Sequence, residues 1–113
     1  MNKPLVYIAG PYTRPDPVAN TRRAILVWQE LREGGLVTPI VPHTSLLMDF
    51  IVPMPFEKWL EYDFEILRKC DAVFRIEGKS YGAGREVREA RFNKIPVFTS
   101  VAELNAWAKE RAK

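Results

Sequence analysis

The hydrophobic positions along the chain form short continuous runs, and these alternate with longer stretches of helical spacing. The first run, Leu5–Ala9, is apolar throughout, which is typical of a strand buried on both faces. Asp16-Pro17 then supplies a helix N-cap and a proline at the first helical position, and Gly34-Gly35 ends that helix. The pattern therefore opens with a strand followed by a long helix.

The rest of the chain repeats this alternation. Pro39 interrupts the second apolar run, which places that strand at a sheet edge. Ser100, with Glu103 three residues later, forms a capping box that starts the last helix. Residues 42–54 are expected to form a loop with many apolar side chains. The other predicted elements are strands over residues 36–41, 71–76 and 95–99, and helices over 55–69, 83–92 and from the capping box to the C-terminus.

Strands that alternate with helices predict right-handed βαβ units and a parallel sheet. The expected fold is α/β: a three-layer αβα sandwich, residues 1–113 as a single domain, with a Rossmann-like, flavodoxin-like sheet of four to five strands. With strand order 2-1-3-4, the winding reverses between the first and third strands, where such folds bind ligands at the carboxyl ends. We therefore expect the site between residues 10–13 and 77–84.

Charge and composition narrow the class of partner. The net charge is +3, but the basic residues are spread over four predicted helices and mixed with acids, so no nucleic-acid polymer is expected. Anionic small molecules remain compatible with this charge. The single cysteine, Cys70, forms no internal disulfide, and the run at Leu5–Ala9 is too short for a signal peptide or membrane span. A cytoplasmic protein without a membrane partner is expected.

One aspartate occupies a place that the amphipathic pattern of its helix reserves for apolar residues. At about 100° per residue, Asp63 lies at the centre of the apolar stripe of helix 55–69, and the other charged residues lie opposite. A carboxylate there is costly unless it is paired or works in a site. Burial also raises its pKa toward values useful in acid–base catalysis. Asp63 is therefore a candidate catalytic residue; the alternative is a structural aspartate bonded to backbone amides or to an arginine.

A second constellation, Ser80-Tyr-Gly-Ala-Gly-Arg-Glu86, follows a predicted strand and opens a helix. Gly82 and Gly84 permit close approach of a ligand to the backbone, and the helix N-terminus favours negative charge. The segment is neither a P-loop nor a complete dinucleotide fingerprint. Glu86 lies on the helix face turned toward the sheet, although an acid in a first turn also suits the helix dipole. Asp63 and Glu86 are thus two inward-facing carboxylates near the point where the winding of the sheet reverses. Such a pair suggests glycosyl chemistry, with one carboxylate as nucleophile and the other assisting the leaving group.

Three segments, residues 7–12, 63–71 and 80–90, resemble the nucleoside 2-deoxyribosyltransferase superfamily. They read Tyr-Ile-Ala-Gly-Pro-Tyr, Asp-Phe-Glu-Ile-Leu-Arg-Lys-Cys-Asp and Ser-Tyr-Gly-Ala-Gly-Arg-Glu-Val-Arg-Glu-Ala. The most specific feature is Gly-x-Gly-x-Glu-x-x-x-Ala, preceded two residues earlier by serine. The resemblance runs in order over residues 4–100, and within the superfamily it is strongest to the 2'-deoxynucleoside 5'-phosphate N-hydrolases.

This resemblance implies a role for each matching residue. Glu86 is the implied nucleophile that attacks C1' and holds the sugar covalently, Asp63 positions the substrate and helps to protonate the departing base, and Tyr7 orients the nucleophile. Asp71 matches a structural aspartate. The resemblance places the 5'-phosphate between two groups of residues: Gly10, Pro11, Tyr12 and Thr13 on one side, Ser80 and Gly82 on the other. It implies no metal, no organic cofactor, and a homodimer or higher homo-oligomer.

The chain departs from the hydrolases in this phosphate pocket. Pro11 and Thr13 stand where the hydrolases carry a serine and an arginine, so one phosphate-binding cation is missing. Arg14 and Arg85 are the candidates to replace it. Family members also borrow a serine from a neighbouring subunit, and Ser100 lies near the corresponding place, although helix capping accounts for it equally well.

Three further features carry two interpretations each. His43 follows the second strand and is a candidate for lining the base pocket; the alternative is an exposed or locally bonded histidine. The apolar segment 44–56 is predicted to be a subunit contact or a lid rather than a membrane element. Cys70 lies in the buried stripe of its helix, which favours an inert thiol over a nucleophile.

The function predicted from the sequence is hydrolysis of the N-glycosidic bond of a (deoxy)nucleoside or nucleoside 5'-monophosphate through a covalent glycosyl–Glu86 intermediate. One alternative is a deoxyribosyltransferase that passes the sugar from the same intermediate to a second base. A short chain with little material beyond the core favours water as the acceptor. The alternative from another class is a non-catalytic nucleotide-binding or sensor domain on the same fold.

Overall fold

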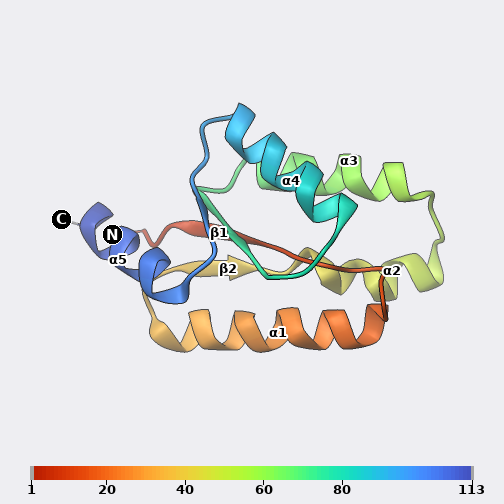
Figure 1. Ribbon diagram of the computed structural model, residues 1–113, viewed down its shortest axis with the longest axis horizontal. Coiled ribbons are helices and arrows are strands. Elements are labelled where there is room, and N and C mark those ends of the chain that lie inside the picture. The colour runs from red at the N-terminus through yellow and green to blue at the C-terminus, as the bar shows by residue number, and fades with distance from the viewer. Residues whose placement is uncertain (1, 113) are drawn as a thin grey trace.

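The computed structural model describes residues 2–112, and its strands form one four-stranded sheet in the order β2-β1-β3-β4 (Figure 1). All neighbouring strands pair in parallel. The predicted strand order is confirmed, and β2, which contains Pro39, lies at an edge as expected. The strands are β1 (Leu5–Ala9), β2 (Thr38–Ile40), β3 (Ala72–Arg75) and β4 (Val97–Phe98).

Helices cover both faces of the sheet, which makes the sandwich of three layers seen in Figure 1. The α-helices are α1 (Pro17–Gly34), α2 (Ser45–Ile51), α3 (Phe56–Leu67), α4 (Tyr81–Phe92) and α5 (Val101–Arg111), and Pro42–Thr44 forms a 3-10 helix, η1. Because side chains alternate along a strand, β1 sends Val6 and Ile8 into a core with α1 and α5. It sends Tyr7 and Ala9 into a second core with α3 and α4.

The helix boundaries follow the capping signals in the sequence. Asp16 accepts a hydrogen bond from Val18 N at 2.9 Å to start α1, and Ser100 accepts one from Glu103 N at 3.3 Å to start α5. The expected start of α4 at residue 83 is wrong by two residues. Ser80 is the N-cap, with its Oγ accepting from Ala83 N at 3.0 Å, so the helix begins at Tyr81.

Two other expectations are corrected. Residues 42–54 are mostly helical (η1 and α2) rather than a loop; α2 has seven residues and buries none of them, so its sequence carries no helical period to detect. The fourth strand covers two residues instead of 95–99. Ile95 N instead donates to Ala90 O at 2.8 Å in the turn after α4, and Pro96 has no N–H to contribute to the sheet.

Asp71 joins three parts of the fold near the amino ends of the strands. Its Oδ2 accepts from Leu5 N at 2.8 Å, and its Oδ1 accepts from Arg111 Nη2 at 3.0 Å. It therefore holds β1, the start of β3 and α5 together, which agrees with the structural role that the resemblance implies. Within residues 2–112, no helix is both long enough and apolar enough to cross a membrane.

The loops that leave β1 and β3 touch each other at the carboxyl edge of the sheet. Gly78 has a φ of +126°, and a Cβ atom there would lie 2.7 Å from Pro11 Cγ. Ile76 N donates to Ala9 O at 2.7 Å, which continues the pairing of β1 and β3 beyond the last strand residue. Glycine at position 78 therefore allows the two loops that border the site to approach this closely.

We expect Gly78→Ala to lower the free energy of unfolding by about 1–3 kcal/mol, because alanine rarely adopts this backbone conformation and its methyl group would meet Pro11. Gly35→Ala is the matched control. Gly35 also has a positive φ, +74°, but no atom lies within 4 Å of its added Cβ, so only the backbone cost of about 1–2 kcal/mol applies. Urea denaturation measures both, and a Gly78 variant no less stable than the Gly35 variant would contradict the close approach.

Candidate active site

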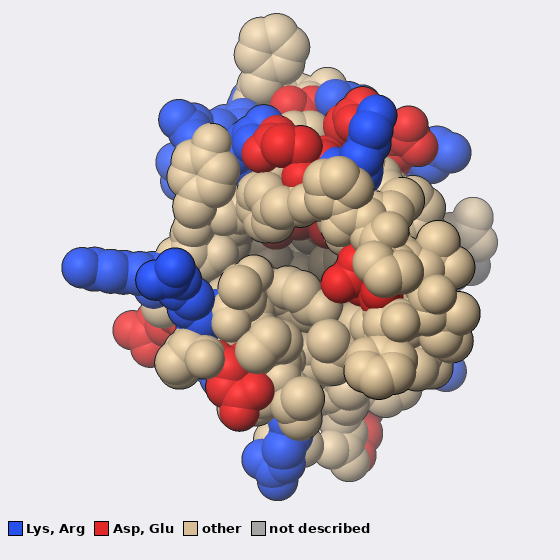
Figure 2. Space-filling model, turned by 90° about the vertical axis from the view of Figure 1, so that its right-hand side faces the viewer, with Lys and Arg blue, Asp and Glu red and all other residues tan. Residues whose placement is uncertain are grey.

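A pocket of about 660 Å³ opens at the carboxyl edge of β1 and β3, where the sheet reverses its winding. Figure 2 shows it as a hollow with acidic atoms inside and a largely uncharged rim. Its walls come from the loop after β1, from η1 and α2, from α3, and from the start of α4. The lining residues are Gly10, Pro11, Tyr12, Thr13, Arg14, Pro17, Pro42, His43, Ser45, Leu46, Asp49, Met54, Phe56, Trp59, Leu60, Asp63, Lys79, Ser80, Tyr81, Gly82, Ala83 and Glu86.

Glu86 lies at the inner end of this pocket and is almost completely buried, with 6% of its surface exposed. The Oη of Tyr7, which is itself fully buried on β1, donates a hydrogen bond to Glu86 Oε2. Burial raises the pKa of Glu86 well above its usual range, whereas the hydrogen bond from Tyr7 and the charge of Arg75 act in the opposite direction. Glu86 is therefore a desolvated carboxyl group held in one orientation.

Asp63 reaches the same pocket from α3. Its Oδ1 is buried and has no hydrogen-bond partner in the described part of the chain, and neither an arginine nor a backbone amide there binds the side chain. The structural alternative for Asp63 is thus not supported. Burial raises the pKa of this carboxyl group to about 7.

The two carboxyl groups are electrostatically coupled, because the charge of Asp63 raises the pKa of Glu86 further. Such a pair holds one proton over a range of pH near neutrality. Tyr7 donates to Glu86 and stabilises its ionised form, whereas Asp63 has no donor among residues 2–112. Burial raises the pKa of Glu86 to about 8 and that of Asp63 to about 7, so the two groups share one proton near neutrality. A nucleophile and a general acid at these positions require that proton to be on Asp63.

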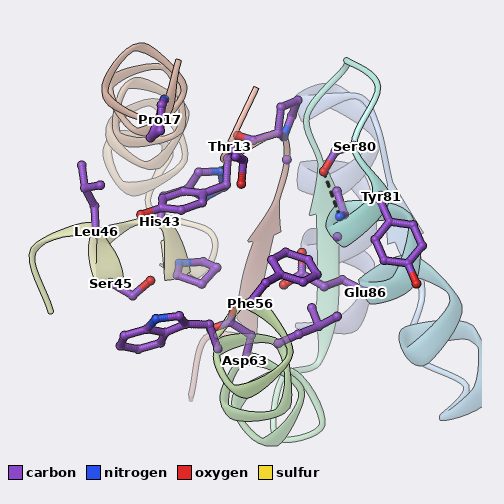
Figure 3. Close-up of a pocket in the computed structure, with 18 of the residues that line it drawn as sticks. Thr13, Pro17, His43, Ser45, Leu46, Phe56, Asp63, Ser80, Tyr81 and Glu86 are labelled. Atoms are coloured by element: carbon purple, nitrogen blue, oxygen red, sulfur yellow. Dashed lines mark hydrogen bonds between the residues drawn. The ribbon is translucent and has the colours of Figure 1, made fainter. Parts of the chain in front are cut away.

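Aromatic side chains form much of the remaining wall (Figure 3). Trp59 and Phe56 come from α3, and the Trp59 Nε1 donates to Asp49 Oδ1 at 2.6 Å. Asp49 also accepts from Met54 N, and these two hydrogen bonds lower its pKa. They connect α2 to the start of α3 across one side of the pocket.

His43 is buried in the opposite wall, edge-on to Tyr12 with ring centroids 5.9 Å apart. Its Nε2 lies 2.9 Å from the carbonyl oxygen of Pro11, which can only accept, so the proton is on Nε2. Nδ1 is then an acceptor, and it has no partner in the part of the chain described. Burial lowers the pKa of His43, so the ring is neutral at physiological pH and its Nδ1 is a buried acceptor.

One of three comparisons with known proteins finds a similar fold. No protein-family model matches the sequence, and no curated protein sequence is significantly similar to it. One solved structure is similar, that of a 2-deoxyribosyltransferase from the psychrotolerant bacterium Bacillus psychrosaccharolyticus. The TM-score is 0.56 at 20% sequence identity, over 86% of this chain and 75% of the other. At this identity the likeness shows that the two chains share an α/β fold.

The structure brings most of the predicted site residues together. Those that line the pocket are Gly10, Pro11, Tyr12, Thr13, His43, Asp63, Ser80, Gly82 and Glu86, and Tyr7 lies beneath them against Glu86. Gly84 does not line it; it faces a second, shallower groove on the other side of α4. The reason is helical geometry, since residues 82, 83 and 86 share the inner side of α4 and residue 84 is turned away.

The fold places the two candidate replacements for the missing phosphate-binding cation, Arg14 and Arg85, in different surroundings. Arg14 lines the pocket, together with Lys79. Arg85 does not, because its Nη1 is paired with Glu57 Oε2 at 2.7 Å on the outer side of the helices. Ser100 caps α5 and is not among the lining residues, so within a single chain it has only the structural role.

Sequence reasoning missed Asp49, Phe56 and Trp59 as parts of the site. Asp49 lies on α2, which the sequence did not reveal, and the two aromatic residues were assigned to the apolar stripe that faces the core. The stripe in fact continues past the end of the sheet, where it faces the pocket instead. Helical period alone does not show which part of an apolar stripe faces a core and which part faces a pocket.

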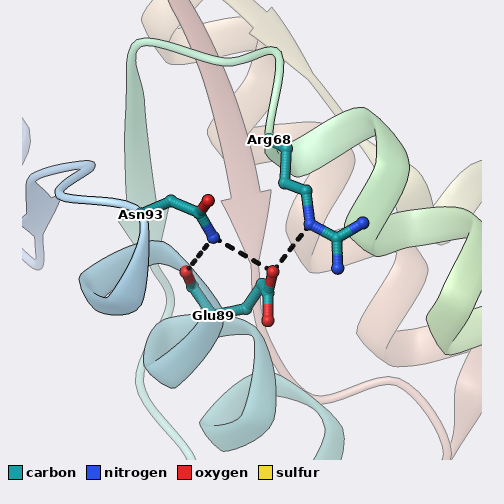
Figure 4. A network of polar contacts seen from close by, with 3 residues as sticks. All are labelled: Arg68, Glu89 and Asn93. Carbon is teal, nitrogen blue, oxygen red and sulfur yellow. Dashed lines mark hydrogen bonds and ion pairs between the residues drawn. The ribbon is translucent and has the colours of Figure 1, made fainter.

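Two ion pairs fix α3 against α4 and so set where Asp63 stands relative to Glu86. One is the Arg85–Glu57 pair near the start of both helices. At the other end, Arg68 Nε donates to Glu89 Oε2 at 2.7 Å, and Asn93 Nδ2 donates to the same oxygen at 3.0 Å (Figure 4). Exposed pairs of this kind contribute little stability, but a pair at each end restricts how the helices slide past each other.

We expect Asp63→Asn to stabilise the protein, and to do so more at high pH. The folded state raises the pKa of Asp63 to about 7, above its value of about 3.9 in the unfolded chain, so the folded state binds more protons. Stability is therefore lost as pH rises from about 4 to about 7, and the substitution removes that loss. At pH 8 the gain should be about 1–3 kcal/mol, and at pH 4 it should be small.

Chemical denaturation at the two pH values measures this difference. Glu61→Gln, an exposed carboxylate on the same helix, is the control that should show no such pH dependence. A pH-independent effect of Asp63→Asn would contradict the raised pKa.

Proposed function

We propose that this protein cleaves the N-glycosidic bond of a (deoxy)nucleoside or nucleoside 5'-monophosphate through a covalent glycosyl–Glu86 intermediate, with water as acceptor. The observation that carries the proposal is the buried Tyr7–Glu86 hydrogen bond facing Asp63 across one pocket. The similar solved structure is that of a 2-deoxyribosyltransferase, and this supports the same class of chemistry.

The first half of the reaction uses the two carboxyl groups in different protonation states. Ionised Glu86 attacks C1' of the sugar, the bond between C1' and the base nitrogen breaks, and the proton of Asp63 passes to the departing base. Tyr7 holds the attacking carboxylate and keeps its Oη proton, because burial and the neighbouring carboxylates raise the pKa of Tyr7. The products of this step are the free base, a glycosyl ester on Glu86 and an ionised Asp63.

In the second half, water attacks C1' and the Glu86 carboxylate leaves. Asp63 accepts the proton of that water, which restores the starting state of both groups. If a second base attacks C1' instead, the same intermediate gives a deoxyribosyltransferase. The similar structure favours this alternative, and both reactions use every residue named here.

The walls of the pocket suit a nucleoside. Its volume lies within the range of about 300–1,000 Å³ that small-molecule sites occupy. Phe56 and Trp59 offer apolar faces for a base, and the unpartnered Nδ1 of His43 offers an acceptor. Ser80 and Gly82 at the start of α4 are suited to the oxygen-bearing 5' side of the sugar.

We also propose a homodimer or higher homo-oligomer. The outer side of α2 and the segment that follows it carry a run of exposed apolar side chains beside the pocket: Leu47, Met48, Phe50, Ile51, Val52 and Met54. Contiguous apolar surface of this kind marks an interaction site more often than a free surface. Sedimentation as a monomer would count against this part of the proposal.

We expect Glu86→Gln to lower the rate of base release at least about a thousandfold, because the amide cannot act as the nucleophile. The assay follows free base by chromatography with deoxynucleosides and with deoxynucleoside monophosphates. Glu65→Gln, an exposed glutamate on α3, is the control that should leave the rate unchanged. Acid-quenched parent protein should carry one added sugar by mass spectrometry, located at Glu86.

Other outcomes would point to the alternatives. Base exchange without net hydrolysis, measured with a second free base present, would identify a transferase. A parent protein that binds nucleosides but cleaves none, with affinity retained in the Glu86→Gln variant, would instead support a binding or sensor domain and contradict the proposal.

A further inference from the structure

Arg75 is an arginine at the last position of a buried central strand. In the register of the sheet it lies opposite Ala9, one residue beyond the pair Ile8 and Phe74. Because side chains alternate along strands, Arg75 points to the same face of the sheet as Val73 on β3 and Tyr7 on β1. That face is covered by α4, so the guanidinium group extends beneath the helix that carries Glu86.

The guanidinium group of Arg75 binds the backbone of the loop between β3 and α4. Its Nη1 donates to the carbonyl oxygen of Ile76, and its Nη2 donates to that of Gly78 at 2.8 Å. Arg23, from α1, donates to the intervening carbonyl oxygen of Glu77. Two arginines therefore hold three successive carbonyl groups, and neither arginine has a carboxylate partner among residues 2–112.

We propose that Arg75 is a positioning residue for the nucleophile: it fixes the loop from which α4 starts and places an unpaired positive charge behind Glu86, which favours the carboxylate over the acid. The inference rests on the proposed role of Glu86 as nucleophile. The inference goes beyond that role because it assigns the control of Glu86 ionisation to Arg75, a residue outside the pocket lining.

The other charged groups around Glu86 do not supply this charge. Tyr7 from β1 is neutral, and Asp63 from α3 disfavours the carboxylate. On α4 itself, Arg85 pairs with Glu57 and Glu89 with Arg68, and β4 contributes no charged side chain. Arg88 and Arg91, also on α4, line the shallow groove on the side of the helix away from the pocket, together with Arg75. Of the cations whose effect on Glu86 is resolved, Arg75 is therefore the one that opposes burial. Burial lowers the pKa of Arg75, and the charge of Glu86 acts against that shift.

The other titratable groups that line the pocket are either engaged elsewhere, neutral or exposed to solvent. Asp49 is engaged by Trp59 and Met54, and His43 is neutral. Arg14 and Lys79 are exposed to solvent, where water screens their charge. The contribution of Arg75 is screened less, because its side chain is half-buried between the sheet and α4.

Two substitutions of Arg75 and one of Arg23 test the proposal. Arg75→Gln removes the charge, Arg75→Lys keeps it but loses the forked contact, and Arg23→Gln loosens the same loop without removing the charge behind Glu86. The readouts are the pH profile of kcat/KM for base release and, independently of activity, the titration of Glu86 followed by carbon NMR of protein labelled at glutamate side chains.

We expect Arg75→Gln to raise the apparent pKa of Glu86 by about one unit, and to move the low-pH limb of kcat/KM upward by the same amount. In the Arg75→Lys variant, the apparent pKa of Glu86 and the low-pH limb of kcat/KM should return toward the parent values. In the Arg23→Gln variant, these two quantities should stay at the parent values even if the protein is less stable. If Arg75→Gln does not fold, Arg75→Met, which also removes the charge, takes its place.

An unchanged Glu86 titration in the uncharged variants would overturn the proposal, as would an equal shift in Arg23→Gln. The NMR titration separates this inference from the proposed function. A shifted Glu86 pKa in a protein that cleaves no nucleoside would uphold the electrostatic role of Arg75 and refute the N-glycosidase.

Discussion

The hydrogen bond between Tyr7 and Glu86 is the interaction on which the arrangement of the site depends. It joins a strand at the centre of the sheet to the first turns of α4, and both side chains are shielded from water. A buried carboxyl group without such a donor would remain protonated and would be free to rotate. With the donor, its orientation is fixed, and part of the cost of ionising it is offset. The sheet therefore defines the position of the Glu86 carboxyl group through one phenol group.

The rest of the fold holds other elements in place around that contact. Short loops leave β1 and β3 at the same edge, and they meet where Gly78 allows Pro11 to approach. Ion pairs at both ends of α3 and α4 hold Asp63 at one distance from Glu86. Helices carry most of the lining, including both carboxyl groups, and the loops after β1 and β3 supply much of the rest. Rigid elements therefore hold the groups whose geometry matters most for chemistry.

The sequence was enough to predict the order of the strands and that Asp63 and Glu86 face each other at the carboxyl edge of the sheet. Alternation of strands and helices determines the sheet, and helical period exposes Asp63 as an acid in an apolar stripe. The helix α2 could not be predicted, since seven residues that bury nothing show no period. The partner of Arg85 and the outward turn of Gly84 depend on how α4 lies against α3, which is a tertiary property.

The surroundings of Arg75 are another feature that the sequence alone does not reveal. In the sequence it follows Ala-Val-Phe at the end of a strand, where an arginine is most simply explained as a residue emerging into solvent. Only the register with β1 and the path of α4 place it on the face of the sheet that α4 covers. Both acids thus line the pocket, whereas Arg75 lies outside its lining, so the charge that we propose to favour the Glu86 carboxylate does not compete with the substrate for space. A cation inside the pocket would stabilise the carboxylate as well, but it would also pair with it and block the attack on the sugar. Holding the cation by backbone carbonyl groups, which cannot neutralise it, keeps its field available to Glu86 while leaving the attacking oxygen free.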